Sequence, residues 1–272
     1  MIKPLFCYDI TVDRKNDGRT GQAFLTRRVD DALKQEMDER SAALTEALFK
    51  SVLTPCHIAG AILCLIGVTV LAAALREAAP LWLPIGSGVT VLAGLVLLAL
   101  GFRRQKQDGE FDRFLEEGTA VAERAAAALG EPEDAILLDI LTRRYRVKGE
   151  NIIVNPFEET DFENDPFCAF VDGRALCLTD NGERYDIPLD EIGDIRRIER
   201  KITISGWYKD GSPTEEPYDR YVLRAGNNDT QVRLPYYYAI SIRHGGEQYE
   251  LYLPPYELST FGTLTGAVIP AE

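Results

Sequence analysis

Residues Ser51–Phe102 read SVLTPCHIAGAILCLIGVTVLAAALREAAPLWLPIGSGVTVLAGLVLLALGF, with Arg76 and Glu77 as the only charged residues. These two residues separate two uncharged segments of 25 residues each. A helix that crosses a lipid bilayer needs about 20 predominantly apolar residues. The stretch therefore predicts a two-helix transmembrane hairpin over 51–102, with spans at about 52–75 and 81–102. A signal peptide is a poorer interpretation, because about 50 mixed polar residues precede the first apolar segment.

Basic residues near the ends of the two segments predict the orientation of this hairpin. Arg40 and Lys50 precede the first segment, and Arg103, Arg104 and Lys106 follow the second. Positively charged flanks are retained on the cytoplasmic side, so both termini are expected in the cytoplasm. The predicted localisation is the cytoplasmic (inner or plasma) membrane, crossed twice, with the lipid bilayer as an integral partner.

Small residues recur every seven positions in both segments and suggest how the two predicted spans pack. They are Gly60, Gly67 and Ala74 in the first segment and Ser87, Gly94 and Gly101 in the second. Small side chains let helix backbones approach closely, which favours association in lipid. The spacing predicts an antiparallel hairpin in which Gly67 faces Gly94.

The segment before the hairpin predicts a strand and then a helix. Residues 1–15 contain the β-branched and aromatic run Leu5–Val12, which is typical of a strand. A lone strand is not stable, so this segment is expected to pair with a sheet elsewhere in the chain. Residues 20–50 have apolar residues at helical spacing, beginning with Leu25 and Val29, and predict an amphipathic helix.

The segment after the hairpin, residues 103–148, predicts further cytoplasmic helices. One extends to Gly130, and a shorter one over Glu133–Tyr145 would have four apolar residues on a single face: Ile136, Leu137, Ile140 and Leu141. The helices on the two sides of the hairpin either pack as an antiparallel stalk or lie separately, and the sequence leaves both arrangements open.

Residues 149–272 have the turn signals of an antiparallel β-domain. Dipeptides such as Asp172-Gly173 and Asn181-Gly182 favour tight hairpin turns. Apolar and polar residues alternate between the turns, as at Tyr249–Leu253, which indicates strands with one buried face. The pattern predicts about seven strands followed by a short closing helix over 256–264. The predicted fold class is an α+β membrane protein with this β-domain in the cytoplasm.

Two short motifs in this domain resemble those of the bacterial pleckstrin-homology-like domains. The first is Ile187-Pro188-Leu189-Asp190-Glu191-Ile192, and the second is Leu251-Tyr252-Leu253-Pro254 leading into a helix. A two-span hairpin before such a domain is similar to the layout of the YcxB-like membrane proteins. The resemblance implies a seven-stranded curled sheet capped by a helix, and a binding or scaffolding role without a known catalytic residue. The hairpin around Tyr208–Asp219 departs from that pattern.

Charge and composition exclude several classes of partner. Residues 150–272 contain 11 basic and 23 acidic residues, so this domain would be repelled by nucleic acid and by anionic lipid.

The five cysteines have no CxxC spacing and are expected to be reduced thiols. The acidic stretch Phe157–Pro166 lacks the glycine and glutamate of a calcium loop, and is expected to be a solvated loop. His57 and His244 have no metal-ligand or nucleophile partner at a recognisable spacing, and no cofactor is expected.

Two groups of residues in the β-domain are candidate contact surfaces. The basic group consists of Arg196, Arg197, Arg200 and Lys201, and the aromatic group of Tyr236, Tyr237 and Tyr238. For the basic residues, local pairing with Glu199, Asp194 and Asp190 is the favoured interpretation. Binding of an anionic lipid headgroup is the alternative. Ordinary sheet packing is likewise favoured for the tyrosines.

No arrangement of acid, base and nucleophile can be proposed, so catalysis is not expected. The sequence favours a membrane-anchored binding or scaffolding protein that binds a protein partner or itself. The alternative is a ligand-gated two-span membrane effector whose β-domain senses a small molecule such as a nucleotide. A nucleotide sensor would need a basic concave pocket, which the acidic composition of the domain does not favour.

Overall fold

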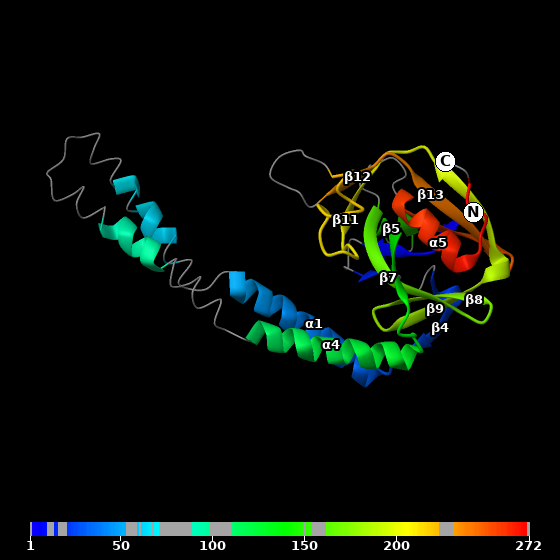
Figure 1. Ribbon diagram of the computed structural model, residues 1–272, viewed down its shortest axis with the longest axis horizontal. Helices are drawn as coiled ribbons and strands as arrows, with labels where there is room; N and C mark the ends of the chain where they lie inside the picture. The colour runs from blue at the N-terminus through cyan, green and yellow to red at the C-terminus, as the bar shows by residue number, and fades with distance from the viewer. Residues whose placement is uncertain are drawn as a thin grey trace. The chain divides into compact units, whose positions relative to one another are not determined.

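A computed structural model describes most of the 272 residues of the chain, and Figure 1 shows the arrangement of its elements. The described residues are 2–9, 14–15, 21–52, 59, 61–66, 68–70, 89–97, 110–148, 151–153, 162–222 and 231–270. The chain forms two compact units. One unit, the β-domain, combines Met1–Val29 with Ala125–Glu272, and the helical unit is Asp30–Arg124.

The predicted transmembrane hairpin is wrong. Among the described residues, no helix combines the length and the apolar character that a membrane crossing requires. Between residues 53 and 109 the structure describes only short helical segments, and the rest of the predicted spans lies outside the described residues. The absence of charge over 25 residues indicated a span, but the helical segments described in this stretch are too short for one. The predicted α+β membrane class and the multi-pass localisation with cytoplasmic termini fail for the same reason.

The β-domain is built mainly from two β-sheets. The larger sheet contains the antiparallel meander β5-β7-β8-β9, extended by β4 at one edge and by β2 and β3 at the other. Their bounds are β2 Cys7–Asp9, β3 Arg14–Lys15, β4 Leu25–Arg28, β5 Ile136–Lys148, β7 Phe162–Asp172, β8 Ala175–Asp180 and β9 Glu183–Pro188. Short elements beside them are η1 (Gly21–Phe24), β6 (Asn151–Ile153) and η2 (Leu189–Glu191). The turn between β8 and β9 has Asn181 and Gly182 at positive φ of 50° and 79°, as hairpin turns require.

A second sheet has the strand order β1-β14-β13-β10. Its strands are β1 Lys3–Pro4, β10 Ile192–Ile198, β13 Tyr237–His244 and β14 Glu247–Leu253. Strand β1 runs parallel to β14, and β2 runs parallel to β5, so the N-terminal segment contributes to both sheets. Two further strands, β11 (Ile202–Gly206) and β12 (Val232–Leu234), pair with each other, and β11 also pairs with β7.

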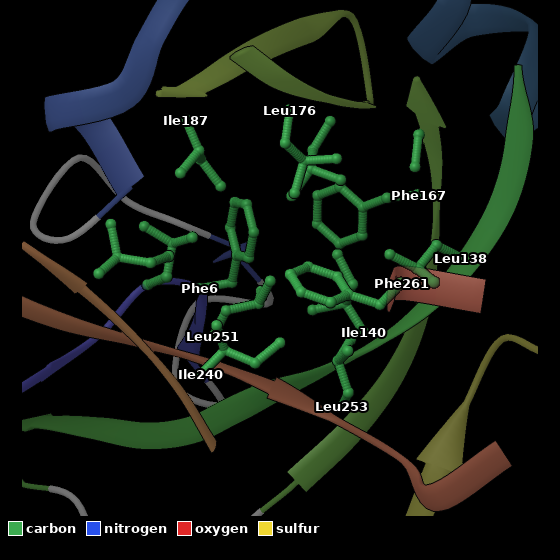
Figure 2. Close-up of a cluster of buried hydrophobic side chains, with 14 of the residues drawn as sticks. Phe6, Leu138, Ile140, Phe167, Leu176, Ile187, Ile240, Leu251, Leu253 and Phe261 are labelled. Carbon is green, nitrogen blue, oxygen red and sulfur yellow. The ribbon is translucent and has the colours of Figure 1, made fainter. Parts of the chain in front are cut away.

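Two hydrophobic cores lie on opposite faces of these strands. Figure 2 shows the first core, where side chains from both sheets and from the C-terminal helix point toward one another. Its fully buried members include Phe6, Leu138, Ile140, Phe167, Leu176, Ile187, Ile240, Leu251, Leu253 and Phe261. The second core contains Leu141, Phe162, Ile202, Ile204, Tyr218, Val232, Leu234, Tyr237, Ala239 and Tyr252. Strand β5 therefore has one face in each core, because successive side chains of a strand point to opposite faces.

Two segments that were predicted to be helical are strands. Strand β5 replaces the predicted helix over Glu133–Tyr145, and β4 lies within the predicted helix over 20–50. In β5 the residues from Leu138 to Thr142 are all buried, so apolar residues occur on both faces. A short run that is buried on both faces can mimic helical spacing, since periodicity alone does not distinguish the two structures.

The C-terminal helix agrees with the predicted closing helix. A short 3-10 turn, η3 (Pro255–Glu257), leads into α5 (Leu258–Thr265), whose Phe261 is fully buried in the first core. The helix ends at Gly266, which has φ of 70° and donates its backbone N–H to the carbonyl of Gly262. This left-handed end is the usual termination of a helix by glycine.

The helical unit contains α1 (Asp31–Val52) and most of α4 (Glu110–Leu129), which Figure 1 shows side by side. The side chain of Asp30 accepts a hydrogen bond from the backbone N–H of Leu33 at 2.7 Å, which caps the start of α1. Ion pairs join Arg40 to Glu117 and Glu36 to Arg124. A residue further along α1 thus pairs with a residue earlier in α4, so the two helices run antiparallel.

Candidate functional site

The basic group from the sequence does not form one surface cluster. Strand β10 carries Arg196, which pairs with Glu250 of β14, and Arg197, whose Nε lies 2.7 Å from Glu199. The guanidinium of Arg197 also lies over the ring of Tyr236, 3.8 Å from its centroid. Arg200 and Lys201 follow in the connection to β11. Adjacent side chains of β10 are therefore engaged with different acidic partners.

The aromatic group is also divided between different environments. Tyr238 is 2% exposed in the first core, and Tyr237 is 5% exposed in the second. Tyr236 is half-buried beside the first core and contacts Arg197. Consecutive residues of β13 alternate between the two cores, so the three rings do not form a joint aromatic surface.

Most of the residues proposed for transmembrane packing lie outside the described part of the chain: Gly60, Gly67, Ala74, Ser87 and Gly101. The exception is Gly94, which is buried in the helical segment 89–97. In the same unit, Cys64 Sγ lies 3.7 Å from the carbonyl oxygen of Val91. The described segments 61–66 and 89–97 are therefore in contact at this point.

These helical segments expose many large aliphatic side chains. The apolar helical surface consists of Ile62, Leu65, Ile66, Val68, Val70, Val89, Leu92, Leu95 and Val96. Their exposed fractions range from 39% at Val70 to 71% at Leu65. Nine of the fifteen exposed large hydrophobic residues in the described part of the chain belong to this surface. Such concentrations of exposed apolar side chains mark binding surfaces more often than scattered ones do.

A buried group of polar residues, the carboxylate cluster, lies beside the second core. It consists of Asp139 on β5, Asn164 on β7, Lys209, Tyr218, and the pair Tyr256 and Glu257 on η3. Asp139, Asn164, Tyr218 and Glu257 are each 0% exposed. Buried carboxylates are rare unless they are paired or protonated, so this cluster is the most unusual chemical feature of the β-domain.

The contacts of the cluster centre on its two carboxylates. The hydroxyls of Tyr218 and Tyr256 donate to Asp139 Oδ2 at 2.5 and 3.1 Å. Glu257 Oε1 accepts the backbone N–H of Asp139 at 3.2 Å and lies 2.5 Å from Lys209 Nζ. The other carboxylate oxygens, Asp139 Oδ1 and Glu257 Oε2, have no hydrogen-bond partner among the described residues, and the same holds for Asn164 Oδ1.

Burial shifts the pKa values in this cluster toward the neutral acids. It raises the pKa of Asp139, an effect that Tyr218, the neighbouring Asn164 and Tyr256 side chains and Lys209 only partly offset. Burial also raises the pKa of Glu257, with Lys209 acting in the opposite direction. The pKa of Tyr208, which packs on Tyr218 with ring centroids 5.0 Å apart, is raised to about 12 by burial and by Asp139. Buried groups with perturbed pKa values are frequent at functional sites, although structural networks produce them too.

Sequence reasoning missed this cluster entirely. Its members come from four separate segments of the chain, and no spacing connects them. The one sequence signal was the departure of Tyr208–Asp219 from the pleckstrin-homology-like pattern, since this segment supplies Lys209 and Tyr218.

A second buried network surrounds Arg184 of β9. Its guanidinium donates to Asp186 at 2.7 Å, to Asp172 at 2.8 Å and to the carbonyl of Leu129 at 3.0 Å. The last contact satisfies a carbonyl at the end of α4, which has no partner within the helix. Burial would raise the pKa of Asp186, but its hydrogen bond and ion pair with Arg184 hold that pKa below its usual value. This network connects β7, β9 and the end of α4.

The acidic stretch and the histidines provide no described metal site. Phe162–Pro166 forms the start of β7, where Asp165 is 1% exposed, so the expected solvated loop is wrong for these residues. Residues 157–161 and His57 lie outside the described residues. His244 Nδ1 lies 2.8 Å from Glu191, and no group of three or more potential metal ligands occurs in the described ranges.

Two thiols of the β-domain, the half-buried Cys168 and the buried Cys177, are weakly acidic. Burial raises the pKa of Cys168 and of Cys177 to about 12 in each case.

A small pocket elsewhere in the domain is lined by Phe6, Thr142, Phe167, Asp180, Asn181, Glu183 and Tyr185. Two carboxylates among its lining residues make it a poor site for a phosphate group.

Comparisons with protein-family models, with curated proteins and with solved structures find no match for this chain.

Proposed function

We propose that this chain is a non-catalytic binding and scaffolding protein that associates with a second copy of itself through the apolar helical surface. The observation that supports this function is the concentration of nine exposed aliphatic side chains on the segments 61–70 and 89–97. Full burial of one such side chain contributes about 1.5–3 kcal/mol relative to exposure. A surface of this composition is therefore a strong source of association energy.

The distribution of charge favours a second copy as the partner. Residues 51–75 and 78–102 contain no formal charge, whereas residues 150–272 contain 11 basic and 23 acidic residues. Two β-domains repel each other, but the uncharged segments of two copies can meet without burying an unpaired charge. The two copies supply identical aliphatic side chains, as a symmetric dimer interface requires.

The β-domain would supply the scaffold. This role falls to the meander β5-β7-β8-β9, the second sheet with β10, β13 and β14, and the C-terminal helix α5. In the proposed dimer, the helical unit joins the two copies and the β-domain is free to bind other proteins. The large β-sheet surface and the buried cores give it a rigid form on which a partner can dock.

The test is the mass of the full-length chain in solution, measured by light scattering after size-exclusion chromatography. The double substitution Leu65→Glu and Leu92→Glu places two charges on the apolar helical surface and should reduce the measured mass to that of a monomer. Val268→Glu is the matched control, because Val268 is 93% exposed but lies in the C-terminal segment. A wild-type chain that is monomeric across the micromolar range, or a double variant with unchanged mass, would contradict the proposal.

A further inference from the structure

The segment Trp207–Val222, between β11 and β12, is attached to the β-domain by two of its side chains. Tyr218 donates its hydroxyl to Asp139 Oδ2 at 2.5 Å, and Lys209 Nζ lies 2.5 Å from Glu257 Oε1. Both acceptors are carboxylates that the segment itself does not contain. The side chains of Tyr218 and Lys209 therefore connect the segment to two buried carboxylates of the β-domain.

The same segment covers part of the second core. Tyr218 is fully buried there, and its ring packs edge-on against Tyr256 with centroids 5.1 Å apart. The ring of Tyr208 also packs against Tyr218, with centroids 5.0 Å apart. Displacement of the segment would remove Tyr218 from this core and bring water to Asp139 and Glu257.

In this arrangement the buried negative charges outnumber the positive charge, and the buried acceptors outnumber the donors. Asp139 and Glu257 together carry two negative charges when both are ionised, and Lys209 supplies one positive charge. The three oxygens Asp139 Oδ1, Glu257 Oε2 and Asn164 Oδ1 are buried acceptors without a donor among the described residues. A buried acceptor that lacks a donor is costly, and so is an excess buried charge. One added proton would remove the excess charge and would turn one of these acceptors into a donor.

We propose that Trp207–Val222 is a proton-dependent latch, which is closed when the Asp139–Glu257 pair holds one proton and opens when that proton is released. On opening, the proton passes to solvent, Lys209 leaves Glu257, and Tyr218 leaves the second core. The latch is thus a conformational switch within the β-domain, and it exposes aromatic surface from the second core when it opens.

The direction of the pH dependence follows from the groups that face the pair. These are Tyr218, Tyr208 and Lys209 from the latch, Tyr256 from η3 and Asn164 from β7. Burial raises the pKa of both carboxylates in the closed state, while the open state has the ordinary carboxylate value of about 4. A raised pKa stabilises the closed state at low pH, and this stabilisation is lost as pH rises through the raised pKa. The opening equilibrium should increase about tenfold per pH unit between those two values.

Hydrogen-deuterium exchange of the full-length chain, followed by mass spectrometry, measures this opening. The peptide that contains 207–222 should lose protection about tenfold per pH unit above pH 4, after correction for the intrinsic pH dependence of amide exchange. Peptides from β8 and β9 should not follow this trend, because they lie outside the latch.

Three variants separate a proton-dependent latch from a merely structural contact. Asp139→Asn keeps the acceptor for Tyr218 but removes the excess charge, so the pH dependence of the latch peptide should flatten. Tyr218→Phe removes a donor that stabilises the ionised Asp139, so the pH-dependent range should extend to higher pH. Asp219→Asn, at an exposed residue of the latch, is the control and should behave as wild type.

The proposal is overturned if Asp139→Asn and wild type lose protection with the same slope, or if the latch peptide gains protection as pH rises. Asp139→Asn could also fail to fold, which near-UV circular dichroism would detect. In that case Tyr218→Phe decides: an unchanged pH range overturns the latch, and an upward extension supports it.

Discussion

Arg184 shows how one buried charge can connect several elements. It is 5% exposed and joins β9 to Asp172 at the end of β7 and to the carbonyl of Leu129 at the end of α4. The guanidinium has a planar set of donors that serves several acceptors at once. The position therefore needs arginine and not merely a positive charge.

Replacement of Arg184 by methionine should strongly destabilise the β-domain. The substitution leaves Asp186 partly buried without its counter-charge, and breaking a buried ion pair in this way costs about 3 kcal/mol or more. Chemical denaturation followed by circular dichroism measures the change. Arg174→Met is the matched control, since Arg174 is 86% exposed and its Nη2 lies 4.0 Å from Asp190. Equal midpoints for the two variants would contradict this account of Arg184.

At the residue scale, the sequence could not reveal either buried polar network. Asp139 occurs in the run Leu137-Leu138-Asp139-Ile140-Leu141, where it looks like the polar face of an amphipathic helix. Only the pairing of β5 with β7 and the position of η3 bring Asp139 close to Asn164 and Glu257. Such clusters depend on tertiary structure, and no local pattern encodes them.

At the scale of elements, the accuracy of the predictions followed the clarity of the burial pattern. The run Tyr249–Leu253, which was predicted from the alternation of Tyr249, Glu250 and Leu251, lies within β14 (Glu247–Leu253). Strand β5 was misassigned because it is buried on both faces. Strands β10 and β11 are separated only by Glu199–Lys201, three charged residues with no glycine or proline to indicate a break in the sequence.

The N-terminal segment is an element whose contribution can be measured. Phe6 is 2% exposed, and its ring centroid lies 4.6 Å from that of Phe167 and 5.1 Å from that of Tyr185. We expect Phe6→Ala to lower the free energy of unfolding by about 3–5 kcal/mol, because it leaves a cavity in the first core. Ile2→Ala, at a residue that is 45% exposed, should have an effect below about 1 kcal/mol. Denaturant unfolding of the two variants would refute this role for the segment if both resembled wild type.

At the scale of the whole molecule, the β-domain is assembled around an inserted helical unit. Its two parts, Met1–Val29 and Ala125–Glu272, meet at β9, which pairs with β4 and binds Leu129 through Arg184. The β-domain residues that flank the helical unit in sequence, β4 and Leu129, therefore both contact β9. The sequence predicted that the N-terminal strand would join the later sheet, but its two uncharged stretches also predicted a transmembrane hairpin, which the described helices do not support.

Removal of the helical unit should leave the β-domain folded. We expect a chain in which Asp30–Arg124 is replaced by a short glycine-rich linker to retain a cooperative thermal transition by near-UV circular dichroism, since both hydrophobic cores lie in the β-domain. The same chain with Phe6→Ala provides a control of reduced stability. Loss of the cooperative transition in the shortened chain would mean that the helical unit is required for the fold.

The parallel pairing of β1 with β14 also determines when the protein can fold during its synthesis. Lys3 pairs with Tyr249, so almost the whole chain must be translated before the first strand has its neighbour. At about 5–20 residues per second, the N-terminal residues wait on the order of ten to fifty seconds on the ribosome. During this interval the backbone N–H of Leu5 lacks its acceptor, the carbonyl oxygen of Glu250. A chain that is truncated before β14 therefore leaves β1 without its parallel neighbour.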